Sequence, residues 1–137
     1  MRTIKFRGKR IDNGEWVYGD LCTKDIHHGV SILTDGVIRN AVRPDTVGQF
    51  TGEFDKDKRE IYEGDIILEQ IDRAHIDKRI VQYYNGSFLA VSTYTSGDQA
   101  YGAWHEKYQS LKYLADTGAN ITVIGNIHDN PELINTK

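Results

Sequence analysis

Turn-forming dipeptides between short apolar runs are the feature that most constrains this 137-residue chain. Asn13-Gly14, Asp35-Gly36 and Asn85-Gly86 each stand between two runs in which apolar and polar residues tend to alternate. Asn, Asp and Gly tolerate the positive φ angles that tight hairpin turns need. The pattern therefore predicts antiparallel hairpins along most of the chain, as in a barrel or a sandwich.

The first half of the chain has the pattern of a β-meander. Residues 5–10 and 15–21 flank the first turn, and residues 30–33 and 37–43 flank the second. Pro44 follows the fourth run, and proline has no N–H group with which to continue a ladder. We therefore expect hairpin-connected strands up to this proline.

A run of six charged residues, 55–60, separates this half from the rest of the chain. Unpaired charges are costly to bury, so the run is expected to form a solvated loop or a hairpin tip. Further apolar runs typical of strands are residues 61–68, 79–84, 87–93 and 121–127. The chain is expected to form one compact unit with two parts, residues 1–60 and 61–137.

Helix is the minority state in the predicted fold. Apolar residues recur at helical spacing at Trp104, Tyr108, Leu111, Leu114 and Ala115. Gly118 follows where a helix often ends in a left-handed residue. The segment 129–132, Asp-Asn-Pro-Glu, supplies a cap and a proline for a short terminal turn. One or two short helices are therefore expected.

Composition limits the classes of protein to which the chain can belong. The single cysteine, Cys22, excludes an internal disulfide, so the cytoplasm is the expected compartment. No stretch approaches the roughly eighteen apolar residues needed to span a bilayer, and no apolar export signal follows the basic start. The formal net charge of −3 gives by itself no reason to expect a nucleic-acid or membrane partner.

The first ten residues nevertheless carry five cations and no acid. Alternation would bury Ile4 and Phe6 and would place three of the cations on the opposite face. The candidate nucleic-acid site comprises Lys5, Arg7, Lys9 and Arg10 for phosphates, with Trp16 and Tyr18 for stacking on unpaired bases. An exposed strand also uses cations to resist edge-to-edge pairing, and this second interpretation stays open.

Eight tyrosines and two tryptophans are more than turns require. Tyr94, Tyr101 and Trp104 lie in a segment rich in Gly and Ser. Tyr and Trp suit interfaces because each combines a large apolar body with a polar tip. These three residues are therefore the candidate interface for a homo-oligomer or a protein partner, and simple filling of the core is the alternative.

The histidines do not form a metal-binding pattern. Adjacent His27 and His28 would point to opposite sides of a strand, and the cluster of Asp72, His75 and Asp77 lacks a fourth ligand in the sequence. No metal is therefore expected.

No motif for catalysis or a cofactor is evident either. Cys22 has no glycine-rich elbow, and Gly48 and Gly52 lack the lysine that ends a phosphate-binding loop. Glu63 and Asp65 flank a turn glycine, where carboxylates typically cap the turn. We therefore expect no catalytic residue and no cofactor.

Five sequence blocks occur along the chain in an order that resembles the YopX family of phage and prophage proteins. They are KFRGK at 5–9, WVYG at 16–19, VGQFTG at 47–52, IYEGDII at 61–67 and IGNIHDNPEL at 124–133. The resemblance implies a bacterial or phage-encoded cytoplasmic protein. It also implies an irregular β-rich amino-terminal half and an SH3-like carboxy-terminal barrel, and it implies no reaction, cofactor or catalytic residue.

Together, the residues and the resemblance predict a mainly β fold. An irregular β-meander is expected over residues 1–60 and a small SH3-like barrel over residues 61–137, with one or two short helices. The expected function is that of a non-enzymatic phage or prophage accessory protein that binds a host or phage protein or assembles with itself. The alternative is a nucleic-acid-binding module that uses the basic amino-terminal strand.

Overall fold

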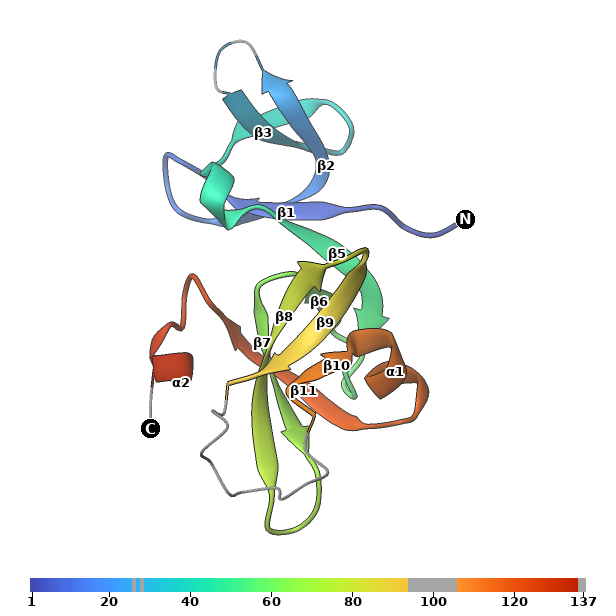
Figure 1. Cartoon of the computed structure of the whole chain (residues 1–137). Helices are drawn as coiled ribbons and strands as arrows, with labels where there is room; N and C mark the ends of the chain where they lie inside the picture. The colour runs from blue at the N-terminus through green and yellow to red at the C-terminus, as the bar shows by residue number, and fades with distance from the viewer. Residues whose placement is uncertain (26, 28, 94–105, 136–137) are drawn as a thin grey trace. The chain divides into compact units, whose positions relative to one another are not determined.

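The chain is built mainly from β-strands, which form two antiparallel sheets (Figure 1). The computed structural model describes residues 1–25, 27, 29–93 and 106–135. The chain divides into two compact units, Met1–Gly52 and Glu53–Lys137. The mainly β class and the two short helices are thereby confirmed, while the SH3-like character of the second part stays a prediction. Among the described residues, no helix has the length and apolar character needed to cross a membrane.

The first unit begins with a meander of hairpins. Its elements are β1 (Phe6–Lys9), β2 (Trp16–Asp25), β3 (Gly29–Thr34), β4 (Ile38–Ala41), the short 3₁₀-helix η1 (Pro44–Thr46) and β5 (Gly48–Phe54). The strand order of the sheet is β4-β3-β2-β1-β5-β6, in which β6 (Glu60–Tyr62) belongs to the second unit. The predicted turns are present: Gly14 has φ of 72°, and Asp35 and Gly36 have φ of 52° and 73°.

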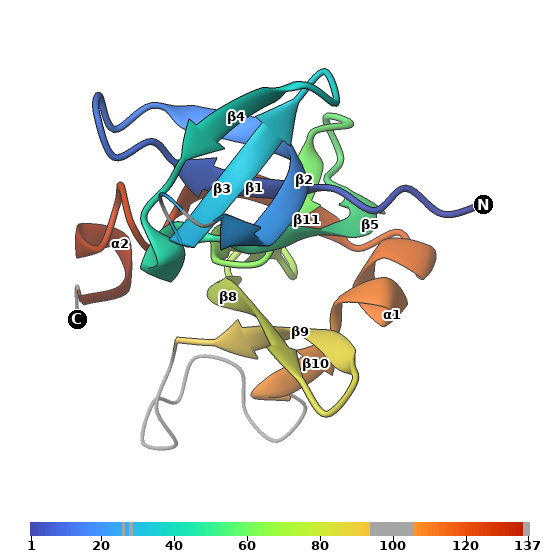
Figure 2. The same cartoon turned by 90° about the horizontal axis from the view of Figure 1, so that it is seen from above.

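The meander curls until its ends meet, as Figure 2 shows for β1 to β4. Arg10 forms an isolated bridge with Val42, and Arg43 donates its backbone N–H to the carbonyl of Lys9 at 2.9 Å. Ile32, Val42 and Phe50 are buried in this unit. These three are the buried hydrophobic residues of the described first unit.

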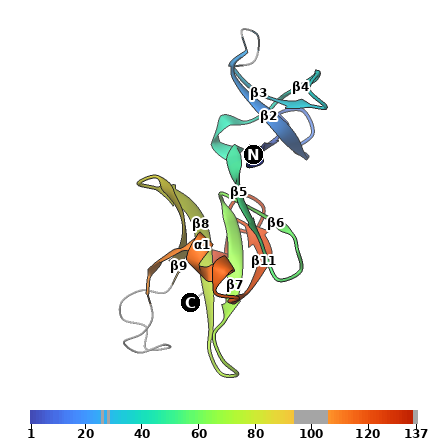
Figure 3. The same ribbon diagram turned by 90° about the vertical axis from the view of Figure 1, so that its right-hand side faces the viewer.

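The second unit carries the other sheet and both α-helices. Its further elements are β7 (Asp65–Gln70), β8 (Ile76–Tyr84), β9 (Ser87–Ser92), β10 (Tyr108–Ser110), α1 (Leu111–Asp116), β11 (Asn120–Asn126) and α2 (Glu132–Asn135). The strand order is β10-β9-β8-β7-β11, and Figure 3 shows the β8–β9 hairpin beside β7. The core comprises Ile61, Ile67, Val81, Ala90, Leu111, Leu114 and Ile121.

The structure corrects the predicted start of the helix α1. Tyr108 was expected in the helix, but it lies in β10, where it pairs with Val91. The helix begins after Ser110, whose side chain accepts the backbone N–H of Tyr113 at 3.2 Å and so acts as the N-cap. Trp104 lies outside the described residues. At the other end, Gly118 has φ of 75°, as predicted.

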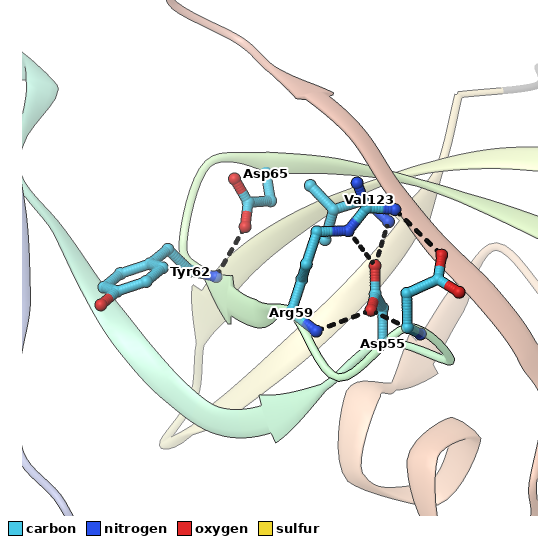
Figure 4. Close-up of polar contacts among 6 residues, drawn as sticks. Asp55, Arg59, Tyr62, Asp65 and Val123 are labelled. Atoms are coloured by element: carbon cyan, nitrogen blue, oxygen red, sulfur yellow. Dashed lines mark hydrogen bonds and ion pairs between the residues drawn. The ribbon is translucent and has the colours of Figure 1, made fainter.

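The charged run 55–60 forms a hairpin tip between β5 and β6, but one of its carboxylates is buried. Asp55 accepts the backbone N–H groups of Val123 at 3.0 Å and of Asp57 and Arg59 at 2.9 Å each, and it also accepts the Nε–H of Arg59 at 3.1 Å (Figure 4). Burial raises the pKa of Asp55, but these donors lower it by more, so the pKa lies below its ordinary value.

This hairpin tip also covers part of the outer edge of β11. The N–H of Val123 is used by Asp55, and Lys56 donates its N–H to the carbonyl of Ile121 at 3.0 Å. Edge strands tend to pair with other chains unless they are covered or interrupted. One edge of the second sheet is therefore protected by the chain itself.

Candidate functional site

The most prominent exposed feature of the second unit is one face of its sheet. Residues directly opposite each other in neighbouring strands share a face; Tyr108 lies opposite Val91, which lies opposite Ile80. The outer aromatic face, as we call it, consists of Ile80, Gln82 and Tyr84 on β8, Leu89 and Val91 on β9, and Tyr108 on β10.

Two tyrosines of the outer aromatic face are largely open to solvent. Tyr84 is 65% exposed and Tyr108 is 62% exposed, whereas Leu89 and Val91 between them are partly buried. None of the six residues carries a charge, although Lys78 precedes Ile80 on the same side of β8 and the Lys107 ammonium lies 5.9 Å from the centre of the Tyr108 ring. Exposed aromatic side chains around partly buried aliphatic ones make a surface suited to contact with another apolar surface.

The opposite face of the same sheet carries a buried ionic network. Arg79 places its Nε 2.8 Å from Glu69 Oε1 and 3.3 Å from Asp77 Oδ2. Ser92 donates its hydroxyl to Asp77 Oδ1 at 2.9 Å. The Arg79 Nη1 donates to the carbonyls of Ala90 at 2.9 Å and Lys107 at 3.2 Å. Each of these acids has a partner within the fold, so the network is built to hold strands together.

Arg79 on β8 bonds to Glu69 on β7, to Ala90 on β9 and to Lys107 directly before β10, and so connects β8 to all three. The sequence analysis missed this role. The available signal was the position of Asp77 and Arg79 two residues apart, which in a strand places both side chains on one face. Three strands are thereby fixed in register at the end of the sheet where β10 begins.

Asp72, His75 and Asp77, from which no metal site was expected, are not all brought together by the fold. Asp72 Oδ1 lies 2.7 Å from His75 Nδ1 in the turn between β7 and β8, whereas Asp77 is buried and bonded to Ser92. Within the described part of the chain, no group of three His, Cys, Asp or Glu residues is placed to hold a metal ion.

The basic amino-terminal strand does place its cations beside aromatic rings. Arg7 lies opposite Tyr18 and Lys9 lies opposite Trp16. The Arg7 guanidinium is 4.6 Å from the centre of the Trp16 ring, and the Lys9 ammonium is 5.6 Å from it. The Lys5 ammonium is 5.4 Å from the centre of the Phe50 ring. Four residues of the predicted nucleic-acid site are therefore neighbours across β1 and β2, as the pairs Arg7–Tyr18 and Lys9–Trp16.

The expected pattern of burial in this strand is wrong at two positions. Arg7 is only 6% exposed, whereas Ile4, expected inside, is 55% exposed. The physical reason is that the guanidinium is weakly hydrated and gains by lying on the Trp16 ring. Arg10 instead forms an ion pair with Asp12, with 2.7 Å between Arg10 Nη2 and Asp12 Oδ2.

The predicted interface residues Tyr94, Tyr101 and Trp104 lie outside the described residues. Their role stays a prediction.

A model of the YopX protein family matches residues 5–135. The chain belongs to the YopX family. The crystal structure of protein EF1440 from Enterococcus faecalis is similar, with a TM-score of 0.54, 22% sequence identity, and coverage of 98% of this chain and 99% of that one. At this identity the likeness concerns the fold alone. No curated protein matches the chain.

Two of the blocks that resemble the YopX family have clear folding roles. In the block at 61–67, Asp65 accepts the N–H of Tyr62 at 2.7 Å and caps the turn (Figure 4), as the sequence predicted. In the block at 124–133, Asn126 accepts the N–H groups of His128 at 3.0 Å and Asp129 at 2.9 Å. These side chains shape turns, which leaves the outer aromatic face as the candidate functional surface.

Proposed function

We propose that this YopX-family chain is a non-enzymatic binding protein that contacts another protein chain through its outer aromatic face. The observation that carries the proposal is the exposure of Tyr84 and Tyr108 on one face of the second sheet. Water around such a surface is released when an apolar partner covers it, and tyrosine loses little side-chain freedom on binding.

The family supports the rest of the proposal. Neither the family nor the similar structure is named for a reaction, and a binding role agrees with both. We place the protein in the cytoplasm of a bacterial host as a phage or prophage accessory protein. The partner is a host or phage protein or a further copy of the chain.

The test replaces the two exposed tyrosines together, as Tyr84→Ser and Tyr108→Ser. Tyr113→Ser is the matched control, because Tyr113 is exposed to a similar degree but lies on α1, away from the face. Complexes formed at native levels are analysed by native mass spectrometry, and self-association by sedimentation. We expect the double variant to lose its complexes and the control to keep them. Equal complexes in both variants would remove the proposal.

Nucleic-acid binding is the second candidate, and the shared face of Lys5, Lys9 and Tyr18 favours it. Phosphate contacts release counterions, so affinity would fall steeply as salt rises. Fluorescence anisotropy with single-stranded DNA, RNA and duplex DNA at low salt tests this candidate. The charge-reversal variant Lys5→Glu with Lys9→Glu should then bind much more weakly. Absence of binding to all three probes would exclude it.

A further inference from the structure

The backbone of β10 is oriented for pairing on its outer side. Among the described residues, β10 is the edge strand of the second sheet, and its neighbour is β9. Ser92 donates its N–H to the carbonyl of Lys107 at 2.8 Å, so this opposed pair is hydrogen-bonded. Such pairs alternate with non-hydrogen-bonded ones in an antiparallel ladder. The next hydrogen-bonded pair is Gln109 with Ala90, and the N–H and C=O of Tyr108 between them point away from β9.

The two outer strands of this sheet therefore differ. On β11 the N–H of Val123 and the carbonyl of Ile121 are already bonded by the hairpin tip 55–60. On β10 the outward groups belong to Tyr108, whose side chain lies on the outer aromatic face. Tyr108 therefore combines an outward backbone N–H donor, an outward C=O acceptor and an exposed aromatic ring.

The edge is held in place before any partner arrives. Arg79 Nη1 donates to the carbonyl of Lys107, immediately before β10, and to that of Ala90 on β9. Ser110 ends the strand by capping α1. A strand fixed at both ends costs less ordering on binding than a loose one.

We propose that the partner contributes an extended peptide segment that adds to β10 as a further strand. This inference rests on the proposed function and names its mode of binding. The segment's backbone would bond to the N–H and C=O of Tyr108, and every second side chain would lie on the outer aromatic face. Because Leu89, Val91 and Tyr108 supply apolar and aromatic surface beside this edge, those alternate side chains should be apolar or aromatic.

The geometry favours a peptide over a second copy of the chain as the occupant. β10 has three residues before α1 begins at Leu111, so two copies paired at this edge would share a very short ladder. A peptide brings no second folded unit to this short edge, and its side chains can pack on the exposed ring of Tyr108 in addition to the backbone bonds.

The first experiment selects binders to the full chain from a random peptide library displayed on phage. A recovered peptide is synthesised with one N-methyl group at each position in turn, and affinity is measured by fluorescence anisotropy. In an added strand only alternate N–H groups face the edge. We expect affinity to fall at least tenfold at alternate positions and to change little at those between. Equal tolerance at every position, or recovery of no binding peptide, would overturn the inference.

The second experiment compares Tyr108→Pro with Tyr108→Ala. Both remove the aromatic ring, but only proline removes the outward N–H, and proline is tolerated at an edge whose N–H faces away from the sheet. We expect the proline variant to bind the peptide at least tenfold more weakly than the alanine variant, with equal unfolding midpoints. Equal peptide affinities of the proline and alanine variants would contradict the inference.

The two proposals fail in different ways. If Tyr108→Ala weakens binding while N-methylation has no alternating effect, the face is used but the strand is not added. If Tyr108→Ala and Tyr113→Ala behave alike, the proposed function fails as well. If sedimentation shows dimers that Tyr108→Pro dissociates, a second copy occupies the edge and the peptide inference is wrong.

Discussion

The carboxylate of Asp55 accepts the backbone N–H of Val123 at 3.0 Å, across a separation of 68 residues. The same carboxylate also accepts two N–H groups of its own hairpin tip and the Nε–H of Arg59. One buried side chain thus orders the tip and attaches it to β11. Its loss would leave several buried donors without a partner.

Asp55→Asn is therefore expected to destabilise the chain, because an amide oxygen without charge is a weaker acceptor and its NH₂ group faces other donors. We expect a loss of about 1–3 kcal/mol in the free energy of unfolding, measured by urea denaturation at neutral pH. Asp57→Asn is the matched control, since the Asp57 side chain is exposed. A loss of similar size in the control would show that the buried contacts of Asp55 are not the cause.

The same carboxylate should make stability depend on acid pH. The pKa of Asp55 in the folded chain lies below the ordinary value of 3.8, so the folded state binds fewer protons there than the unfolded state. Its contribution is complete above the ordinary pKa and is lost as the pH falls through the lower, folded pKa. The difference in unfolding free energy between the wild type and Asp55→Asn should shrink from pH 5 downward. A constant difference across this range would contradict the assignment.

The hairpins were predictable because their determinants are local. Asp35, Asn85 and Gly86 adopt positive φ in the turns where the sequence placed them. The cap of a short helix is also a local feature, yet the sequence analysis did not identify Ser110 as the N-cap. The helical spacing of apolar residues from Trp104 onward had predicted an earlier start of the helix. Tyr108 lies in a strand because it pairs with Val91 on β9, and this pairing partner is distant in the sequence.

The buried charges were not predictable, because their partners are distant in sequence. The charged run 55–60 looks solvated, and Asp55 differs from its neighbours only through Val123. Likewise, Asp77 was grouped with Asp72 by proximity in sequence, whereas its hydroxyl partner is Ser92 on the next strand. The outer aromatic face needed the register of three strands before Tyr84 and Tyr108 could be placed together.

The buried network around Arg79 gives a further prediction. Arg79→Met removes the cation and leaves the buried Asp77 carboxylate beside the partly buried Glu69 carboxylate. Loss of one partner from a buried ion pair typically costs about 3–5 kcal/mol, so we expect a large drop in the urea midpoint. Adding Asp77→Leu and Glu69→Leu to this variant should restore part of the loss, since no uncompensated charge then remains. A single variant as stable as the wild type would show that the network is not needed for folding.

Gly125 should be replaceable only if Asn130 changes with it. A Cβ at position 125 would stand 2.5 Å from Asn130 Oδ1 and 2.8 Å from its Cγ, closer than such atoms approach. Asn130 Oδ1 also accepts the N–H of Asn126 at 3.2 Å, so the side chain is held where the clash occurs. We expect Gly125→Ala to lower the unfolding free energy by roughly 1–3 kcal/mol, and to cost at least 1 kcal/mol less, on the order of a typical coupling energy, in an Asn130→Ala background. A double-mutant cycle by urea denaturation measures this coupling. If the cost of Gly125→Ala were the same in both backgrounds, the contact with Asn130 would not be the reason for glycine at this position of β11.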